Sequence, residues 1–483
     1  MTISTSLQKI RKDRIDKAEK LRKIGINPYP AKSKKNNTCS QMKDCEGKDV
    51  CVAGRLRALR GHGGSLFADI FDITGKTQIF FSEDLIGEEK YKLLELIDIG
   101  DFIEVEGNVF KTKAGEITVK ANDFNILTKA IRPLPEKWHG LSDVETRLRK
   151  RYLDLIMNPE IKEMFIKKTK FWTSVRKYLS EQNFLEVETP TLEITPGGAD
   201  ANPFITHHDA LDTNFYLRIS LELHLKRLIV GGFEKIFEIG RVFRNEGIDA
   251  QHLQDYTQME FYWAYADYED LMDLLEDFYK FLVKETVGSL KTLHNGKNID
   301  WSKKWERLDY NSLFKEKVGL DLLTITIEDL KKKAKELNIH YKKNMGKGRL
   351  IDLIYKRVIR PGIVQPSFLI NLPVEISPLA KRKEKDSQLT QRIIIVANGY
   401  ELGNGFSELN DPVDQENRFK EQQKLRDEGD DEAQMYDKDF VEALEYGMPP
   451  TAGFGMSERL FSFLMDKPIR ECVFFPMMRK DND

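Results

Sequence analysis

Between residues 50 and 130, short segments that alternate apolar and polar residues follow one another and are separated by turns. The segments are VCVAGRLRAL, SLFADIFDI, TQIFFS, DFIEVEGNVFKT and EITVKANDFNIL. Alternation with a period of two predicts strands, and several short strands at regular spacing are typical of a small barrel. Five such strands fit a barrel of the oligonucleotide-binding (OB) type.

The segment before this barrel predicts one helix and a linker, which together form residues 1–49. Residues 7–24 repeat apolar positions at helical spacing and carry lysines and arginines over much of the rest, and Pro28 and Pro30 would end the helix. We expect either an amphipathic helix that packs on the body of the protein or a basic arm that contacts RNA phosphates. Residues 31–49 are rich in Lys, Asn, Ser and Thr and predict a linker.

The remainder of the chain mixes helical and strand patterns, which predicts an α+β domain over residues 151–483. A charged stretch with several prolines, residues 131–150, connects it to the barrel. MFIKKTKFWTSVRKYLSEQN is amphipathic, whereas FEIGRVF and MEFYWAY have strand composition and would pair as a long antiparallel hairpin. Residues 268–365 have a mostly helical pattern, and we expect them to form an insertion on the sheet.

Composition and charge narrow the class of protein. A chain of 483 residues with 40% hydrophobic residues predicts a globular protein of two or more domains. The formal net charge is −2, so only local patches can indicate a nucleic-acid partner. No apolar stretch is long enough to span a bilayer, and the N-terminus lacks the apolar core of a signal peptide, so we expect a cytoplasmic protein without a membrane partner. The cysteines, which lack the paired spacing of a zinc ribbon and are expected to be free thiols, are Cys39, Cys45, Cys51 and Cys472.

Two arginines follow candidate strands or loops. Arg244 follows FEIGRVF and begins a polar loop, and Arg459 ends the glycine-rich segment GMPPTAGFGMSER. A guanidinium binds a carboxylate or a phosphate through two parallel hydrogen bonds, and glycines allow the backbone to approach a ligand closely. Arg244 could equally face water on a surface hairpin.

Three glutamates could bind a metal ion or a cationic group of a substrate. Glu401 and Glu408 lie in GYELGNGFSELND, where strict strand alternation would place them on opposite faces, although the glycines between them would allow a bulge. Such carboxylates fit magnesium coordination, binding of a cationic substrate or a solvated acidic edge. Glu222, near a predicted helix start, could cap the helix or hold a substrate amine. His207 and His208 would point to opposite faces of a strand and are interpreted as structural.

Three residues of the predicted barrel could contact a nucleic acid. Phe67 lies on the second strand, Gln78 on the next, and Glu116 follows a Lys-Ala-Gly turn. An exposed aromatic ring can stack on a base, and amide and carboxylate groups can read base edges. Phe67 could instead belong to the barrel core, so the pattern leaves the ligand open.

The segments FLEVETP, GRVFRNEG and GMPPTAGFGMSERL resemble, in this order, the three motifs of class II aminoacyl-tRNA synthetases. Most of the chain is similar to bacterial-type class II lysyl-tRNA synthetases, through RYLDL, PGGA, FITHH, YLR, SPLA, NGFSELND, GDDEA and ALEYG. The resemblance implies an enzyme that activates L-lysine with ATP to lysyl-adenylate and pyrophosphate, and then transfers lysine to the 3′ end of tRNA(Lys). It also implies an anticodon-binding OB-fold barrel, a catalytic domain with a six- or seven-stranded antiparallel sheet, and a homodimer formed through the FLEVETP region.

Carried over by position, the resemblance assigns four sets of residues. The ATP-binding set, in which the two arginines would be catalytic, is Arg244, Glu246, His252, Tyr256, Glu401 and Arg459. The lysine pocket would be formed by Gly198, Glu222, Glu260, Tyr262, Asn404 and Glu408. Phe67, Gln78 and Glu116 would read the anticodon, and Glu401 would bind Mg²⁺. The pocket makes chemical sense, because a buried ammonium needs a carboxylate and further acceptors to offset its desolvation.

The chain departs from the family's pattern at three places. Ile394 stands where the family usually has a first magnesium-binding glutamate, so we expect fewer or differently held metal ions. The loop that begins at His252 reads HLQDYT in place of HNPEFT, and the segment that ends at Arg459 is one residue shorter than usual. These departures motivate an alternative, a divergent paralogue that binds tRNA or nucleotide without charging tRNA. A synthetase for aspartate or asparagine would share the barrel and the core, but it should not present Glu408 and Tyr262 together.

Overall fold

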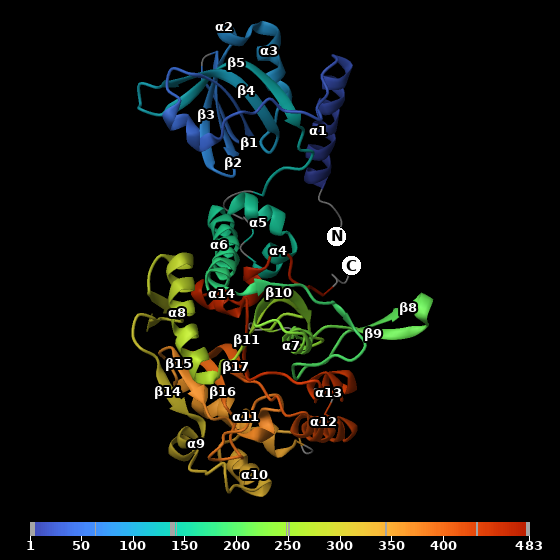
Figure 1. Ribbon diagram of the computed structural model, residues 1–483. Helices are drawn as coiled ribbons and strands as arrows, with labels where there is room; N and C mark the ends of the chain where they lie inside the picture. Colours follow the sequence, from blue (N-terminus) through green and yellow to red (C-terminus); the bar gives the residue numbers. More distant parts are fainter. Residues whose placement is uncertain are drawn as a thin grey trace. The chain divides into compact units, whose positions relative to one another are not determined.

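The computed structural model describes residues 5–62, 64–135, 141, 143–247, 249, 252–342, 345–430 and 433–479. The chain separates into two compact units between Asp143 and Val144, inside the predicted connector 131–150 (Figure 1). We call them the barrel unit and the sheet unit. Each has its own hydrophobic core.

The barrel unit is a closed five-stranded barrel with the strand order β1-β2-β3-β5-β4 (Figure 1). Only β3 and β5 pair in parallel. The strands are β1 (Asp49–His62), β2 (Ser65–Asp72), β3 (Gly75–Ser82), β4 (Phe102–Lys111) and β5 (Ile117–Thr128). Between β3 and β4 lie the short helices α2 (Glu83–Ile86) and α3 (Glu88–Leu93). The predicted five strands and the OB-type barrel are confirmed.

The segment before β1 packs on the barrel. Helix α1 (Thr5–Lys23) contributes Leu21 to the barrel core, and Arg14 Nη1 donates a hydrogen bond of 2.9 Å to the carbonyl of Ala130. A 3-10 turn, Cys39–Asp44, buries Cys39 and Met42 in the same core. Residues 31–49, expected as a linker, therefore supply part of the barrel's apolar interior.

The sheet unit is built around eight strands in the order β14-β15-β16-β17-β18-β11-β10-β6. The six central strands are antiparallel, and each edge strand, β14 or β6, pairs in parallel with its neighbour. The expected six- or seven-stranded antiparallel sheet is thus corrected to eight strands. Their bounds are β6 (Leu185–Glu186), β10 (Lys235–Phe243), β11 (Asp255–Ala264), β14 (Glu306–Asp309), β15 (Ser367–Ile370), β16 (Arg392–Ala397), β17 (Tyr400–Ser407) and β18 (Thr451–Ser457).

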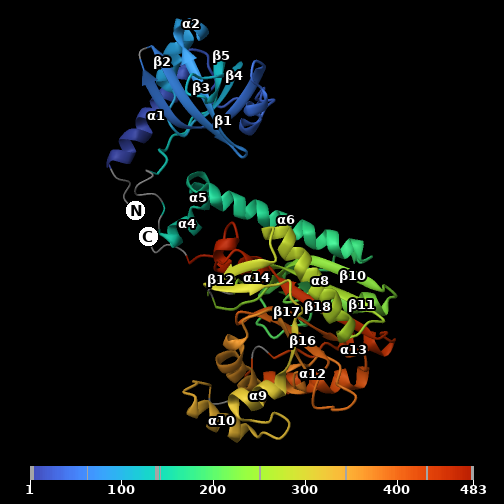
Figure 2. The same cartoon turned by 90° about the vertical axis from the view of Figure 1, so that its left-hand side faces the viewer.

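Alternate residues of the central strands face two different layers. Phe237 and Phe261 pack into the main core with α6 (Pro159–Glu181) and α8 (Tyr268–Val287), which lie against each other on one face of the sheet (Figure 2). Ile236 and Tyr262 face the opposite side, where they pack with α7 (Glu222–Val230) and α13 (Lys438–Glu445). The other helices are α4 (Val144–Arg149), α5 (Arg151–Met157), α12 (Pro412–Asp427) and α14 (Arg459–Leu464).

The region 268–365 is more varied than the helical pattern predicts. Helix α8 belongs to the main core, and β14 joins the main sheet. The hairpin of β12 (Lys291–His294) and β13 (Lys297–Asp300) lies between them. The rest forms a satellite core from α9 (Tyr310–Val318), α10 (Ile327–Glu336), α11 (Lys347–Ile354) and a π-helical turn (Tyr355–Ile359).

A three-stranded sheet of β7 (Leu192–Glu193), β9 (Thr213–Leu217) and β8 (Ile205–His208) completes the unit. His207 and His208 lie exposed on β8, where His207 Nδ1 contacts Asn214 Oδ1 and His208 Nδ1 accepts a hydrogen bond from the backbone N–H of Leu211. All four cysteines are free thiols, as predicted. Within the described part of the chain, no helix combines the length and the hydropathy that a membrane span requires.

Candidate active site

A β-bulge in β17 decides which side chains reach the site. The pairing of β16 with β17 shifts between Ile395↔Gly403 and Val396↔Glu401, so Leu402 is the extra residue. Leu402 turns into the main core, whereas Glu401 and Glu408 both line one cavity on the other face of the sheet. The bulge that the glycines allowed therefore brings the two carboxylates to the same side.

The cavity has a volume of about 350 Å³. Its lining includes ten of the predicted site residues: Gly198, Glu222, Arg244, Tyr256, Glu260, Tyr262, Glu401, Asn404, Glu408 and Arg459. Glu246 and His252 are outside this lining, and His252 Nδ1 lies 2.7 Å from Asp249 Oδ2. Residues 248, 250 and 251 of the same loop, and Asp431 and Glu432 of GDDEA, lie outside the described residues.

At one end of the cavity, Glu260 accepts hydrogen bonds on both carboxylate oxygens. Ser220 Oγ and Gln258 Nε2 each lie 2.6 Å from its Oε1. The hydroxyl of Tyr262 donates to Oε2 at 3.0 Å. Burial raises the pKa of Tyr262 well above its usual value, so this hydroxyl stays a donor. Ser220 and Gln258 were not predicted from the sequence, because their role depends on contacts with a carboxylate 40 and 2 residues away, respectively.

A buried lysine, Lys226 on α7, lies between two carboxylates. Its Nζ is 2.5 Å from Glu222 Oε1 and is ion-paired with Glu408 Oε2. The N-cap residue of α7 is Leu221, and the carboxylate of Glu222, in the first turn, is paired with Lys226. Sequence reasoning missed Lys226, although its position four residues after Glu222 on a helix was a usable signal.

Glu222, Lys226 and Glu408 shift one another's pKa values. Burial raises the pKa of Glu222 to about 7 and that of Glu408 well above its usual range, and Lys226 opposes both effects. For Lys226, burial alone would lower the pKa, but the two carboxylates outweigh it and the pKa is raised. Apart from the ion pair with Lys226, neither oxygen of Glu408 accepts a hydrogen bond from the described residues. Glu408 is therefore a buried carboxylate with unused acceptor positions.

The opposite end of the cavity is cationic. The Arg244 guanidinium carbon lies 5.7 Å from the centre of the Tyr256 ring. Burial raises the pKa of Tyr256, against the effect of Arg244 and Arg459. Arg459, at the start of α14, lines the same cavity, so the shortened glycine-rich segment still delivers this arginine.

Glu458, the residue before Arg459, fixes the position of Arg459 at the start of α14. Its buried carboxylate is ion-paired with Lys168 of α6 and accepts a hydrogen bond of 3.1 Å from the backbone N–H of Thr257. The start of α14 is thereby attached both to α6 and to strand β11. These two long-range contacts hold the start of α14 in place, although the glycine-rich segment before it is one residue shorter than usual.

Glu401 lies among the cations Lys356, Arg360 and Arg459. Arg360 Nη1 donates to its Oε1 at 3.2 Å. Burial alone would raise the pKa of Glu401, but Lys356, Arg360 and Arg459 outweigh it and the pKa is lowered. Mg²⁺ prefers a near-octahedral set of oxygen ligands. In the described residues, the one cluster of three ligand-type side chains lies in the barrel unit, at Cys51, Glu104 and Glu106. The donor set at Glu401 therefore does not fit a magnesium ion held by several protein carboxylates.

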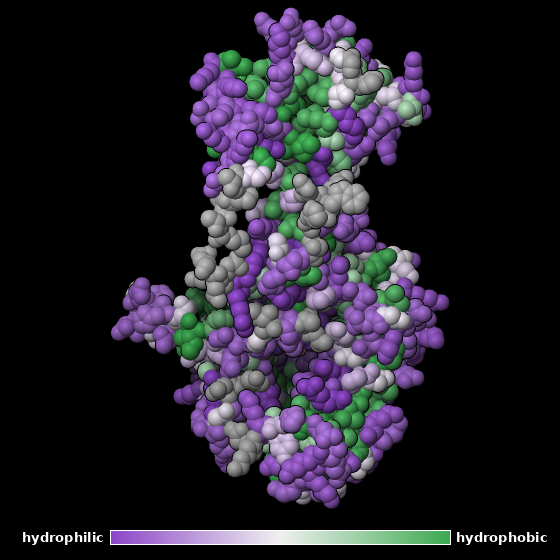
Figure 3. Space-filling model, turned by 180° about the vertical axis from the view of Figure 1, so that it is seen from behind, coloured by the Kyte–Doolittle hydropathy of each residue, from purple (hydrophilic) through white to green (hydrophobic). Residues whose placement is uncertain are grey.

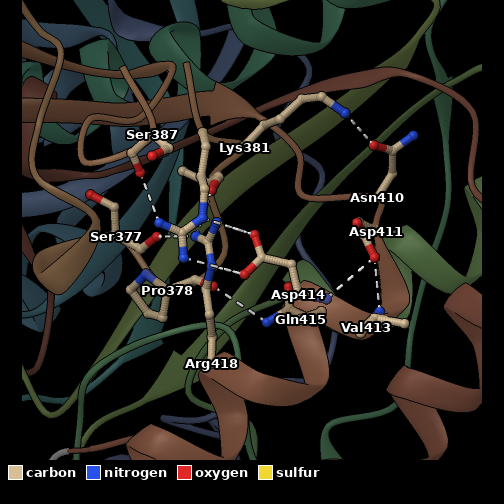
Figure 4. A network of polar contacts seen from close by, with 12 residues as sticks. Ser377, Pro378, Lys381, Ser387, Asn410, Asp411, Val413, Asp414, Gln415 and Arg418 are labelled. Atoms are coloured by element: carbon tan, nitrogen blue, oxygen red, sulfur yellow. Dashed lines mark hydrogen bonds and ion pairs between the residues drawn. The ribbon is translucent and has the colours of Figure 1, made fainter. Parts of the chain in front are cut away.

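The SPLA segment forms part of the cavity wall and is held from behind by α12 (Figure 4). Arg418 Nη1 donates to the carbonyls of Ser377 at 3.1 Å and Ala380 at 2.7 Å. The same guanidinium pairs with Asp414 at 2.7 Å, and Asp411 caps α12 by accepting from the N–H groups of Val413 and Asp414. Residues that are distant in the sequence thus fix this wall.

The barrel unit has a candidate nucleic-acid-binding face. Phe67 is outside the barrel core and packs against Phe80, with the ring centres 5.0 Å apart and the planes tilted by 50°, and the ring centre of Phe80 lies 6.3 Å from that of Phe110. Gln78 Nε2 donates to Glu116 Oε2 at 3.0 Å, so two of the three predicted anticodon readers are hydrogen-bonded to each other. An aromatic row beside fixed polar groups is suited to bases of a single strand.

Comparisons with known proteins agree with this arrangement. Residues 143–479 match the family described as tRNA synthetases class II (D, K and N), and residues 50–127 match the OB-fold nucleic acid binding domain. The chain is 47% identical to the lysine–tRNA ligase of Thermoanaerobacter pseudethanolicus, over 99% of this chain and 97% of that protein. It is 45% identical to the lysine–tRNA ligase of Bacillus subtilis, over 97% and 96% respectively. The chain therefore belongs to the class II lysyl-tRNA synthetase family.

Proposed function

We propose that the chain is a lysine–tRNA ligase whose two steps take place in the cavity described above. In the first step, a carboxylate oxygen of lysine attacks the α-phosphorus of ATP, the bond to the β-phosphate oxygen breaks, and pyrophosphate leaves. In the second, a hydroxyl of the terminal tRNA ribose attacks the acyl carbon of lysyl-adenylate, and AMP leaves. Neither step needs a protein nucleophile, so positioning and charge neutralisation supply the rate.

The buried, unused acceptor positions of Glu408 carry the assignment of lysine as the amino acid. The cavity is lined by the carboxylates of Glu222, Glu260 and Glu408, and the ammonium of Lys226 is ion-paired with the first and the last of them. Once ionised, three carboxylates against the ammonium of Lys226 and the guanidinium of Arg392, which donates to Asn404 at 2.8 Å, leave one negative charge, which suits a cationic amino acid such as lysine. An aspartate side chain would need a cation where Glu408 stands. Asn404 and Tyr262 would complete the ε-ammonium site, and Gly198 would admit the α-amino group.

ATP would occupy the cationic end. Arg244 would contact the α-phosphate and the lysine carboxylate, Arg459 the γ-phosphate, and Tyr256 the adenine ring. Glu246 and His252 would approach the nucleotide from the motif loop. Magnesium would enter as the counter-ion of ATP, that is, as part of the substrate, and Glu401 is the carboxylate at that end with which it could associate.

The barrel unit would bind the anticodon of tRNA(Lys) through Phe67, Gln78 and Glu116, while the sheet unit charges the 3′ end. Binding of tRNA through the OB-fold domain follows from the family. The substrates ATP, lysine and tRNA are available in the cytoplasm, and we propose that compartment.

A homodimer through the FLEVETP region would explain the apolar surface around β6. Leu185, on β6, is 53% exposed, and Ile194, which directly follows β7, is 74% exposed. Figure 3 shows further apolar side chains, in green, at the base of the β8–β9 hairpin. Edge strands with exposed apolar residues are suited to pairing with a second copy.

ATP–pyrophosphate exchange, measured with each standard amino acid and with magnesium titrated, tests the proposed function. Exchange with lysine alone is the expected result. No exchange with any amino acid, in a folded protein, would contradict it and would favour the alternative of a paralogue that binds tRNA or nucleotide without charging tRNA. Ile394 and the altered HLQDYT loop are the features that would support that alternative.

A further inference from the structure

The end of the cavity at Glu401 carries cations where a protein-held metal ion would need carboxylates. We propose that Lys356 and Arg360 neutralise the β- and γ-phosphates of ATP, and that they replace the magnesium ion that a carboxylate at position 394 would otherwise hold. This inference rests on the proposed function, because it takes ATP as the ligand of that end. It assigns a phosphate-binding role to two residues of the satellite core.

Position 394 is occupied by a buried aliphatic side chain in this protein. Ile394 is 6% exposed, and its neighbours in the satellite core include Ile354 and Tyr355. It also lines the cavity, next to Asn404 on the paired strand. An aliphatic side chain there contributes packing and has no atom that can bind a metal ion, so this wall of the cavity has lost one negative charge relative to a glutamate.

Arg360 is not in the lining of the cavity, but it is bonded to Glu401, which is. One of its nitrogens, Nη1, donates to Glu401 Oε1 at 3.2 Å, while its Nε is buried and has no hydrogen-bond partner among the described residues. A buried donor without an acceptor costs free energy and calls for an explanation. A phosphate oxygen beside Glu401 would provide the missing acceptor, and a guanidinium can offer two parallel N–H groups to it.

Lys356 lies four residues before Arg360 and lines the cavity itself. Its ammonium is 2.8 Å from Asp352 in an ion pair at the surface, where the lysine side chain is 43% exposed. An exposed i,i+4 pair contributes little to stability, so the long, flexible side chain is free to exchange this partner for a phosphate. Counting Lys356, Arg360, Arg459 and Arg244 against Glu401 and Asp352 leaves two positive charges at this end.

The backbone holds Arg360 in a fixed relation to Glu401. The β16–β17 turn donates hydrogen bonds from Asn398 N to Val364 O at 2.9 Å and from Gly399 N to Ile363 O at 3.0 Å. Gly399 has φ +75°, and a Cβ there would lie 3.3 Å from Pro361 Cα. The segment that carries Arg360 is therefore packed directly on the turn that precedes Glu401. The fold itself holds the cations at this end of the cavity in position.

Calorimetric binding of ATP, without lysine or tRNA, tests the inference. We expect the native protein to bind ATP in EDTA within about tenfold of its affinity in excess Mg²⁺. The double variant Lys356→Gln/Arg360→Gln should lose at least tenfold more affinity in EDTA than in Mg²⁺, since only the metal can then neutralise the phosphates. Lys315→Gln, which removes an exposed lysine of α9 outside the cavity, is the matched control and should change neither value.

An absolute requirement for Mg²⁺ in the native protein, or equal losses by the double variant in both conditions, would overturn the inference. Arg360→Gln alone, checked by its melting temperature, keeps the test decisive should the double variant fail to fold. The reciprocal variant Ile394→Glu/Arg360→Gln should make ATP binding depend on Mg²⁺. No ATP binding in any condition overturns the inference together with the proposed function, whereas ATP binding without lysine-dependent exchange contradicts the proposed function alone.

Discussion

The ammonium nitrogen of Lys226 lies 2.5 Å from Glu222 Oε1, and both side chains are buried. The amino-acid end of the cavity thus contains a lysine of its own, which balances part of the charge of Glu222 and Glu408 before any substrate arrives. A buried charge is tolerated only when it is paired, so the three groups form one electrostatic unit.

Replacing this ammonium should damage the protein strongly. Lys226→Met removes one partner of a buried pair, which costs on the order of 3–5 kcal/mol when the remaining charge stays buried. We expect a lower melting temperature and a raised KM for lysine. Lys280→Met is the matched control, because Lys280 makes an i,i+4 pair with Glu276 at 2.6 Å near the surface of α8. Equal effects of the two substitutions would show that Lys226 has no special role.

Lysine binding should become tighter as pH rises through neutrality. The pKa of Glu222 is raised to about 7, so at pH 6 this carboxylate is mostly protonated and by pH 8 it is mostly ionised. A substrate ammonium prefers the ionised form, hence the KM for lysine should fall by up to about tenfold between these two pH values. Glu222→Gln should raise the KM and reduce this slope, to which Glu408, whose pKa is also raised, still contributes, and a flat profile in the native protein would contradict the assignment. Exchange kinetics at saturating ATP provide the measurement.

A methyl group at Gly453 should block the lysine side chain but spare ATP. A Cβ built there would clash with Glu408 Oε1 and lie 2.5 Å from Tyr262 Cε1. Gly453→Ala should therefore raise the KM for lysine at least tenfold and leave the KM for ATP nearly unchanged. Gly455→Ala, whose Cβ would meet Glu260 Cγ at 3.3 Å, is the milder neighbour for comparison. A rise confined to the KM for ATP would place the amino acid elsewhere.

The barrel substitutions should separate the two steps of the reaction. Phe67→Ala/Gln78→Ala removes a ring from the aromatic row and an amide that is bonded to Glu116. Stacking on one base is worth about 1–3 kcal/mol, so charging of tRNA should weaken substantially while ATP–pyrophosphate exchange continues. Equal losses in both assays would refute the anticodon assignment. Tyr91→Ala, in α3 of the same unit, serves as a control for general damage to the barrel.

Strand patterns predicted the barrel and the central hairpin well because alternation is a local signal. Sequence left the relation of Glu401 to Glu408 open, since it depends on where one extra residue enters β17, and only the pairing with β16 fixes Leu402 as that residue. Lys226 and Arg360 were missed for a related reason. Glu408, the second partner of Lys226, and Glu401, the partner of Arg360, come from other elements, and a charged residue in a helical pattern is usually on a solvated face.

The contact of Arg360 with Glu401 is the clearest example of a site feature that the residue pattern could not predict. The helical character of residues 268–365 was visible, but whether any of them approaches Glu401 depends on the packing of Pro361 on the β16–β17 turn. The two parallel edge strands of the sheet were invisible for the same reason, because β6 and β14 are only 2 and 4 residues long and their neighbours are far along the chain.

The two ends of the cavity rest on different hydrophobic clusters. Tyr262 and Phe406, at the proposed lysine end, belong to the cluster around α7 and α13, whereas Ile394 and Tyr355, at the proposed phosphate end, belong to the satellite core. Local stability can differ between such clusters. Warming or a core mutation that loosens the satellite core would then weaken nucleotide binding first, and the protein would still select lysine while it lost the means to activate it.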